Sequence, residues 1–170
     1  MPSPSAPSQP RDYSHVATEA LPDVSWTLEP WLRQPAMAAA DPARQQQVRQ
    51  AFAHAWAGYR EHAWGADELD PKVQEGVHSY GMGLTLVDSL DTMLLMGLDA
   101  DFAQAMRWVE TSLSFGLQEE INVFEVTIRV LGGLLSAYEI SQHPALLAKA
   151  DELGQQLLFA FHTPTGLPYG

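Results

Sequence analysis

The chain has 170 residues, 46% of them apolar, and a formal charge of −12 at pH 7. This length and apolar content fit one domain with a hydrophobic core. The negative charge argues against a nucleic-acid partner and against an anionic membrane surface, because binding to either needs clustered Lys and Arg. The sequence contains no cysteine, which excludes disulfides, thiolate metal sites and cysteine nucleophiles. An acidic surface is compatible with cations and with neutral polar ligands such as sugars.

The first 40 residues predict an irregular leader rich in Pro, Ala and Ser. Eight of the chain's 12 prolines lie before residue 45. Because this stretch has no apolar period, it has little to bury, and we expect residues 1–40 to pack loosely. Residues 41–170 are expected to form the folded domain. The N-terminus shows no signal-peptide pattern. No apolar run reaches the roughly 18 residues that a membrane span needs, since the longest candidate, 84–98, contains Asp88 and Asp91.

From residue 41 on, the apolar pattern predicts five helices and no strand. Asp41-Pro42 is typical of a helix start, an N-cap residue followed by proline at the first helical position. Residues 66–83 contain one proline and three glycines and predict a loop. Five helices with short connections predict an all-α fold of stacked helical hairpins. They are expected at 41–62, at about 84–96, from Asp99 on, through Glu125 to near Ser141, and from Pro144 to about Phe161.

The fourth of these helices carries two stripes of side chains at helical spacing. One is apolar and consists of Phe124, Ile128, Leu131, Leu135 and Tyr138. The other is small and polar and consists of Glu125, Arg129, Gly132 and Ser136. Two adjacent glycines cost a helix roughly 1 kcal/mol each, which suggests that a neighbouring segment or a ligand comes close. Glu125 is a candidate catalytic acid, and a structural ion pair between Glu125 and Arg129 is the alternative.

Two carboxylates lie on one face of the second predicted helix. Asp88 and Asp91 fall in line with Thr85 and Thr92 between apolar residues. A buried carboxylate needs a partner, so these acids could face a sugar or a cation, or could buttress a neighbouring loop. Trp64 could stack on a sugar, or could pack in the core. The six histidines include no pair at metal-ligand spacing, so no metal site is predicted from them.

Several segments resemble, in the same order, the class I α-1,2-mannosidases of glycoside hydrolase family 47. The resemblance runs nearly without gaps from residue 50 to 170. It rests on six dispersed motifs, which are Phe52-Ala53-His54-Ala55-Trp56 with Tyr59, Trp64-Gly65-Ala66-Asp67-Glu68-Leu69 with Pro71, the segment Gly83 to Thr92, Met96-Gly97-Leu98, the Glu125 helix with Gly132-Gly133-Leu134-Leu135-Ser136-Ala137-Tyr138, and the segment Ala160 to Tyr169.

The resemblance implies an (α/α)7 barrel with an axial pocket. This chain would form about five helices of it, the N-terminal portion of the catalytic domain at residues 41–170, and the barrel would not be closed. It also implies that Glu125 protonates the glycosidic oxygen and that Arg129 contacts the substrate mannose. We expect Arg129 to point mainly at sugar hydroxyls rather than to pair with Glu125, and the face of Glu125, Arg129 and Gly132 to turn toward a concave side. Asp88 and Asp91 are the further candidates for binding substrate.

The activity implied is the inverting, calcium-dependent hydrolysis of terminal α-1,2-linked mannose from high-mannose N-glycans. An inverting enzyme needs an acid and a base about 6.5–9.5 Å apart, and the base and the calcium ligand would lie beyond this chain. The implied location is the lumen of the secretory pathway, in the endoplasmic reticulum or the Golgi. Two alternatives stay open: a non-catalytic lectin that binds mannose glycans in quality control, and an incomplete fragment that is inactive alone.

Overall fold

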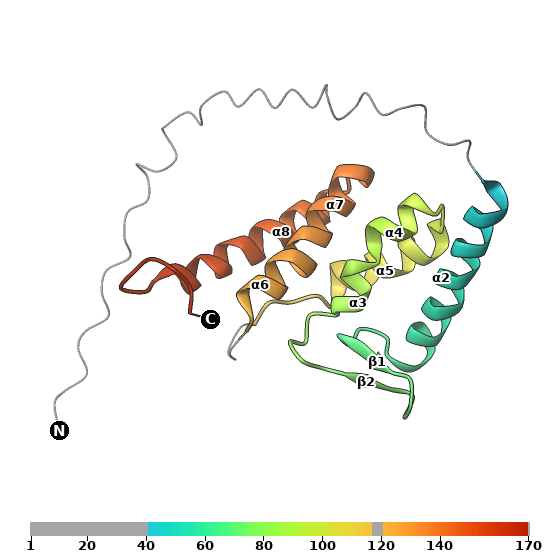
Figure 1. Ribbon diagram of the computed structural model, residues 1–170. Helices are drawn as coiled ribbons and strands as arrows, with labels where there is room; N and C mark the ends of the chain where they lie inside the picture. The colour runs from blue at the N-terminus through green and yellow to red at the C-terminus, as the bar shows by residue number, and fades with distance from the viewer. Residues whose placement is uncertain (1–40, 117–120, 170) are drawn as a thin grey trace. The chain divides into compact units, whose positions relative to one another are not determined.

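The computed structural model describes residues 41–116 and 121–169, and the predicted leader lies outside these residues. The described part is mostly helical, as predicted, but it also contains a small β-hairpin (Figure 1). Its elements in chain order are α2 (Pro42–His62), β1 (Glu68–Asp70), β2 (Glu75–Val77), α3 (Leu84–Asp88), α4 (Leu90–Leu95), α5 (Asp99–Thr111), α6 (Val123–Glu125), the π-helix η1 (Val126–Leu131), α7 (Gly132–Ser141), α8 (Pro144–Leu157) and the 3₁₀-helix η2 (Leu158–Phe161).

Helix α2 begins at Pro42, as predicted from Asp41-Pro42, and joins the core through its last turns. Trp56 and Tyr59 are its buried residues. The indole Nε1 of Trp56 donates to Asp101 Oδ1 at 3.1 Å, and Arg60 reaches the same oxygen at 3.0 Å. These contacts fasten the C-terminal half of α2 to α5.

The hairpin corrects two expectations, the loop at 66–83 and the purely helical fold. Strands β1 and β2 pair antiparallel, with Leu69 opposite Gly76. Each strand has only three residues, too few to show an alternating pattern. A Cβ on Gly76 would lie 2.7 Å from the Cβ of Ala66, so the hairpin closes against the chain that precedes it.

The second predicted helix is interrupted at Ser89, between α3 and α4. The Ser89 hydroxyl donates to the carbonyl of Thr85 at 2.6 Å, and such bonds from a side chain back to the preceding turn bend helices. Leu84, Leu86, Val87, Leu90 and Met93 of these two short helices are buried. Both short helices therefore contribute to the core on either side of the break.

The fourth predicted helix is continuous from α6 to α7, but its middle is a π-helix. The buried stripe is Val126, Val130, Leu134 and Ala137. Of the predicted apolar stripe, Phe124, Ile128 and Leu135 are 66%, 51% and 43% exposed. The predicted apolar stripe is therefore not the buried face of this helix.

Helix α7 packs against α4 on one side and α8 on the other (Figure 1). Helix α8 starts at Pro144 and is continued by η2 to Phe161, as predicted. One hydrophobic core runs from Trp56 on α2 to Leu157 on α8. Within the described ranges, no helix has both the length and the apolarity to cross a membrane.

Candidate functional site

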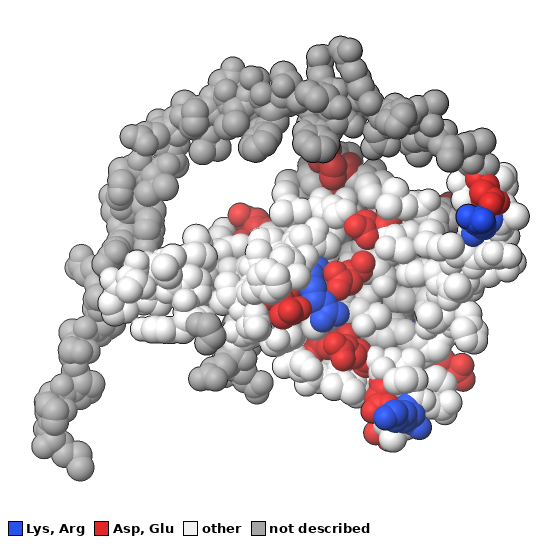
Figure 2. All heavy atoms as spheres, viewed as in Figure 1, with Lys and Arg blue, Asp and Glu red and all other residues white. Residues whose placement is uncertain are grey.

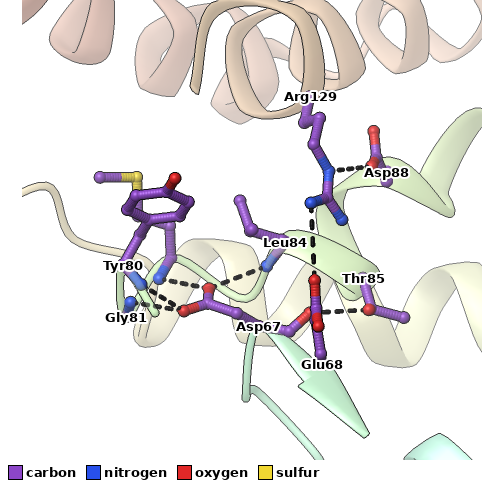
Figure 3. A network of polar contacts seen from close by, with 9 residues as sticks. Asp67, Glu68, Tyr80, Gly81, Leu84, Thr85, Asp88 and Arg129 are labelled. Atoms are coloured by element: carbon purple, nitrogen blue, oxygen red, sulfur yellow. Dashed lines mark hydrogen bonds and ion pairs between the residues drawn. The ribbon is translucent and has the colours of Figure 1, made fainter. Parts of the chain in front are cut away.

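Arg129 brings together three segments that are far apart in the sequence (Figure 3). It extends from η1, and its Nε donates to Oδ2 of Asp88 on α3 at 2.9 Å. Its Nη1 lies 3.8 Å from Oε1 of Glu68 on β1. The hydrogen bond with Asp88 raises the pKa of Arg129, burial lowers it, and the charges of Asp88, Glu68 and Glu125 raise it further, with a net rise. The guanidinium is thus held as a fixed cation.

Glu125 lies one turn before Arg129, in the first turn of the helical rod. Its backbone N–H donates to the side chain of Asn122 at 3.0 Å, which caps the start of α6. The side chain of Glu125 is half-buried. Among the ion pairs of the described residues, Arg129 joins Asp88 and Glu68 and not Glu125. The structural pair between Glu125 and Arg129, the alternative left open by the sequence, is therefore not formed.

Asp88 and Asp91 each meet a residue of the polar stripe. Asp88 holds Arg129, and Asp91 Oδ2 accepts a hydrogen bond from Ser136 Oγ at 2.7 Å. Among the described residues, no hydrogen bond joins either acid to a loop. Asp88 is exposed and Asp91 is half-buried. Two members of the polar stripe, Arg129 and Ser136, therefore contact α3 and α4, and Arg129 is already paired with acids of the chain itself.

Asp67, absent from the predicted site, is the most buried acid near this cluster, with 0% of its surface exposed. Its Oδ2 accepts hydrogen bonds from the backbone N–H groups of Tyr80 and Gly81, both at 2.7 Å. Its Oδ1 accepts from Met82 at 2.9 Å and Leu84 at 3.1 Å. Burial of the Asp67 carboxylate tends to raise its pKa, but the four donors outweigh burial and the net pKa is lowered.

The tryptophans near the cluster pack against protein. Trp64 is partly buried against Trp56 and Tyr59, with ring centroids 5.9 and 6.5 Å away. This favours the core interpretation of Trp64 over sugar stacking. Trp108 lies against Gly65 and Gly83, where an added Cβ would come within 2.6 and 2.5 Å of the indole.

Carboxylates outnumber cations around Arg129. The charges of Glu68, Asp88 and Glu125 all act on it, and acidic side chains gather around a small basic group on the face drawn in Figure 2. The guanidinium can donate hydrogen bonds to sugar hydroxyls, and the carboxylates beside it can accept hydrogen bonds from them.

Calcium needs six to eight oxygen ligands, and the described residues contain no group of three or more acids and histidines placed to hold a metal ion. These residues do not fit a calcium site.

Sequence reasoning missed the roles of Asp67 and Glu68. Both stand in the Trp64-Gly65-Ala66-Asp67-Glu68-Leu69 motif. The donors to Asp67 lie 13 to 17 positions away, and Arg129, the ion-pair partner of Glu68, lies 61 positions away. The glycines at 81 and 83 were the available signal, because a loop with positive φ at two positions presents successive N–H groups to one acceptor.

Comparisons with known proteins identify the family to which the chain is similar. Residues 51–170 match the sequence model of glycosyl hydrolase family 47. The chain is 49% identical over 130 residues to a mannosyl-oligosaccharide 1,2-alpha-mannosidase of Arabidopsis thaliana, covering 76% of this chain and 23% of the relative. It is 48% identical over 126 residues to the human endoplasmic reticulum mannosyl-oligosaccharide 1,2-alpha-mannosidase, covering 74% and 18%.

A solved structure shows the same likeness in three dimensions. The alpha-1,2-mannosidase from Trichoderma reesei superposes with a TM-score of 0.72 at 31% identity, over 77% of this chain and 30% of that one. The chain spans about a fifth of the length of the curated relatives it matches.

Proposed function

Since this chain belongs to glycosyl hydrolase family 47, we propose that it contributes to the hydrolysis of terminal α-1,2-linked mannose from N-glycan oligosaccharides. The observation that carries the proposal is the placing of Arg129, fixed by Asp88 and Glu68 one helical turn from Glu125. The relatives named above bear the name of this activity. The substrate proposed for this chain is a high-mannose N-glycan.

In the proposed reaction Glu125 is the general acid that gives a proton to the glycosidic oxygen. Arg129 binds hydroxyls of the reacting mannose through the N–H groups that Asp88 and Glu68 leave available. This replaces the expectation that Arg129 points mainly at sugar, because its Nε is committed to Asp88. Asp88 and Asp91 accept from sugar hydroxyls at the edge of the same site, and the face of Glu125, Arg129 and Gly132 lines the substrate pocket.

The remaining parts of the reaction are proposed to come from the rest of an (α/α)7 barrel, of which this chain forms about five helices. The base that activates water belongs there, about 6.5–9.5 Å from the acid as inversion requires. Calcium, implied by the family, would supply a cation for sugar hydroxyls. We propose that the activity lies in the lumen of the secretory pathway, in the endoplasmic reticulum or the Golgi, and the names of relatives from the endoplasmic reticulum support this.

Glu125→Gln in the complete catalytic domain tests the assignment. The amide keeps the shape of the side chain but cannot give a proton, and general acid catalysis contributes on the order of 10²–10⁴ in rate. We expect mannose release from α-1,2-mannobiose to fall by at least a hundredfold while substrate binding stays within a few-fold. Unchanged kcat would reject Glu125 as the acid.

The same assay of mannose release tests the two alternatives, a non-catalytic lectin and a fragment that is inactive alone. A complete domain that binds mannobiose but never releases mannose would instead be a lectin. We expect the 170-residue chain alone, with calcium, to be inactive, and mannose release by it would show that the acid and the base both lie within these residues.

A further inference from the structure

We propose that Asp67 is a positioning residue for Arg129: one buried aspartate locks the strand that carries Glu68 to the helix that carries Asp88. These two acids approach Arg129 from different segments, so their spacing depends on how β1 and α3 are joined. The effect of Asp67 on catalysis rests on the function proposed above, whereas its effect on Arg129 does not.

The side chain of Asp67 holds the loop that leads into α3 (Figure 3). Its two oxygens take the N–H groups of Tyr80, Gly81, Met82 and Leu84. Gly81 and Gly83 have φ of 69° and 63°, a conformation that turns successive N–H groups toward one acceptor. The chain between β2 and α3 is therefore wrapped around this one carboxylate.

The main chain of Asp67 holds α3 itself. Its carbonyl accepts from the N–H of Thr85 at 3.0 Å and from the Thr85 hydroxyl at 2.7 Å. Its own N–H donates to Val77 in β2 at 2.9 Å. Asp88 follows Thr85 by one helical turn, and Glu68 is the next residue after Asp67. Of the two acids that hold Arg129, Glu68 is thus adjacent to Asp67, and Asp88 is three residues from Thr85, the hydrogen-bond partner of Asp67.

An ionised carboxylate suits this position and an amide does not. All four groups that face Asp67 are donors, and a carboxylate offers only acceptors. The side chain of an Asp67→Asn variant would turn an NH₂ group toward two of those donors, and a buried donor without an acceptor is costly. The loop would have to open on one side, which would free the start of α3 and let Asp88 move relative to Glu68.

The Nε–H proton of Arg129 gives a direct readout, because this proton is the one donated to Asp88. In ¹⁵N-labelled full chain we would assign it with Arg129→Lys and measure its chemical shift and its exchange with water. We expect Asp67→Asn to move the signal toward that of freely solvated arginines and to speed its exchange at least tenfold. Asp88→Asn provides the reference for complete loss of the contact.

The matched control is Asp70→Asn in the same hairpin. The Asp70 carboxylate accepts one backbone hydrogen bond, from Lys72 at 2.8 Å, and among the described residues no hydrogen bond or ion pair joins it to α3. We expect it to leave the Arg129 signal unchanged. A folded Asp67→Asn chain with wild-type exchange at Arg129 would overturn the proposal, whatever its loss of stability, because Asp67 would then support only the loop.

If Asp67→Asn fails to fold, Thr85→Val decides the question. This change removes only the hydroxyl bond to the Asp67 carbonyl, and we expect exchange at Arg129 to rise at least threefold. Unchanged exchange would overturn the proposal. Failure of the proposed function is visible separately, as an unaltered kcat for Glu125→Gln, and it leaves the exchange measurement intact.

Discussion

Gly133 of α7 lies directly against Val87 of α3. A Cβ atom added to Gly133 would be 3.1 Å from the carbonyl oxygen of Val87 and 3.3 Å from its Cγ1. The neighbouring Gly132 has no such contact, since its nearest atom is the Thr127 carbonyl oxygen of its own rod at 3.5 Å. Gly133, and not Gly132, therefore allows α7 and α3 to pack closely. This packing keeps Asp88, the next residue after Val87, within reach of Arg129.

Overpacking against Val87 should cost Gly133→Ala about 1–3 kcal/mol, because α7 must move away from α3 to admit the methyl group. The better helix propensity of Ala offsets up to about 1 kcal/mol of this cost. Gly132→Ala is the matched control one residue away. It should be neutral or should stabilise by up to about 1 kcal/mol through its better helix propensity. Urea unfolding followed by circular dichroism measures both, and equal effects would show that the contact with Val87 is not what requires glycine.

Gly83→Ala tests the packing of Trp108. Gly83 has φ of 63°, and a Cβ there would lie 2.5 Å from the indole. Ala in this conformation costs about 1–2 kcal/mol, and displacing the indole should add about 1–3 kcal/mol. Gly81→Ala carries the first cost alone, because Gly81 has φ of 69° and nothing within 4 Å of the added atom. Thermal unfolding should rank Gly83→Ala below Gly81→Ala, and the reverse order would contradict the packing argument.

Signals within a few residues of each other predicted much of this fold. The starts of α2, α5 and α8 follow from Asp41-Pro42, Asp99 and Pro144, because helix ends are set by nearby residues. The π-helix could not be predicted in this way. The choice of buried face was also wrong, since Phe124, expected on the apolar face, is 66% exposed.

The candidate site shows the same limit more strongly. Proximity of Arg129 to Glu125 follows from their spacing alone. The pairing of Arg129 with Asp88 spans 41 positions, and nothing at either position specifies the other. Asp67 belongs to a recognisable motif, but its four donors are backbone groups, which every sequence has. A buried acceptor of backbone N–H groups can be recognised only once the loop is folded around it.

Asp88→Asn should separate stability from function. The pair with Arg129 is partly exposed, with side-chain exposures of 39% and 27%, so its loss should cost less than about 1 kcal/mol of unfolding free energy. In the complete catalytic domain we expect kcat/KM on mannobiose to fall at least tenfold, because Arg129 loses its charged anchor. Glu68→Gln should have a smaller effect, since that contact is longer at 3.8 Å. A larger loss for Glu68→Gln would assign the main anchor to β1.

The lowered pKa of Asp67 predicts how its contribution to stability depends on pH. Four N–H donors hold the folded-state pKa below the ordinary value of 3.8. The stabilisation is therefore fully present above that value and is lost as pH falls toward and through the folded-state pKa. Near pH 7 we expect Asp67→Asn to lower the unfolding free energy by roughly 3 kcal/mol, since hydrogen bonds to a buried charge are replaced by unpaired donors.

Urea unfolding of the wild-type chain and of Asp67→Asn, from pH 7 down to pH 2.5, measures this dependence. The difference in unfolding free energy between wild type and Asp67→Asn should stay constant down to about pH 5 and should narrow below pH 4. The reason is that protonation of Asp67 weakens the wild-type contacts, while the amide does not titrate. At pH 7, Asp70→Asn should give a much smaller difference, because it removes a charge from one hydrogen bond at the surface. A difference for Asp67→Asn that widened with acid would mean that Asp67 is held protonated in the folded chain, and the loop would then need another explanation.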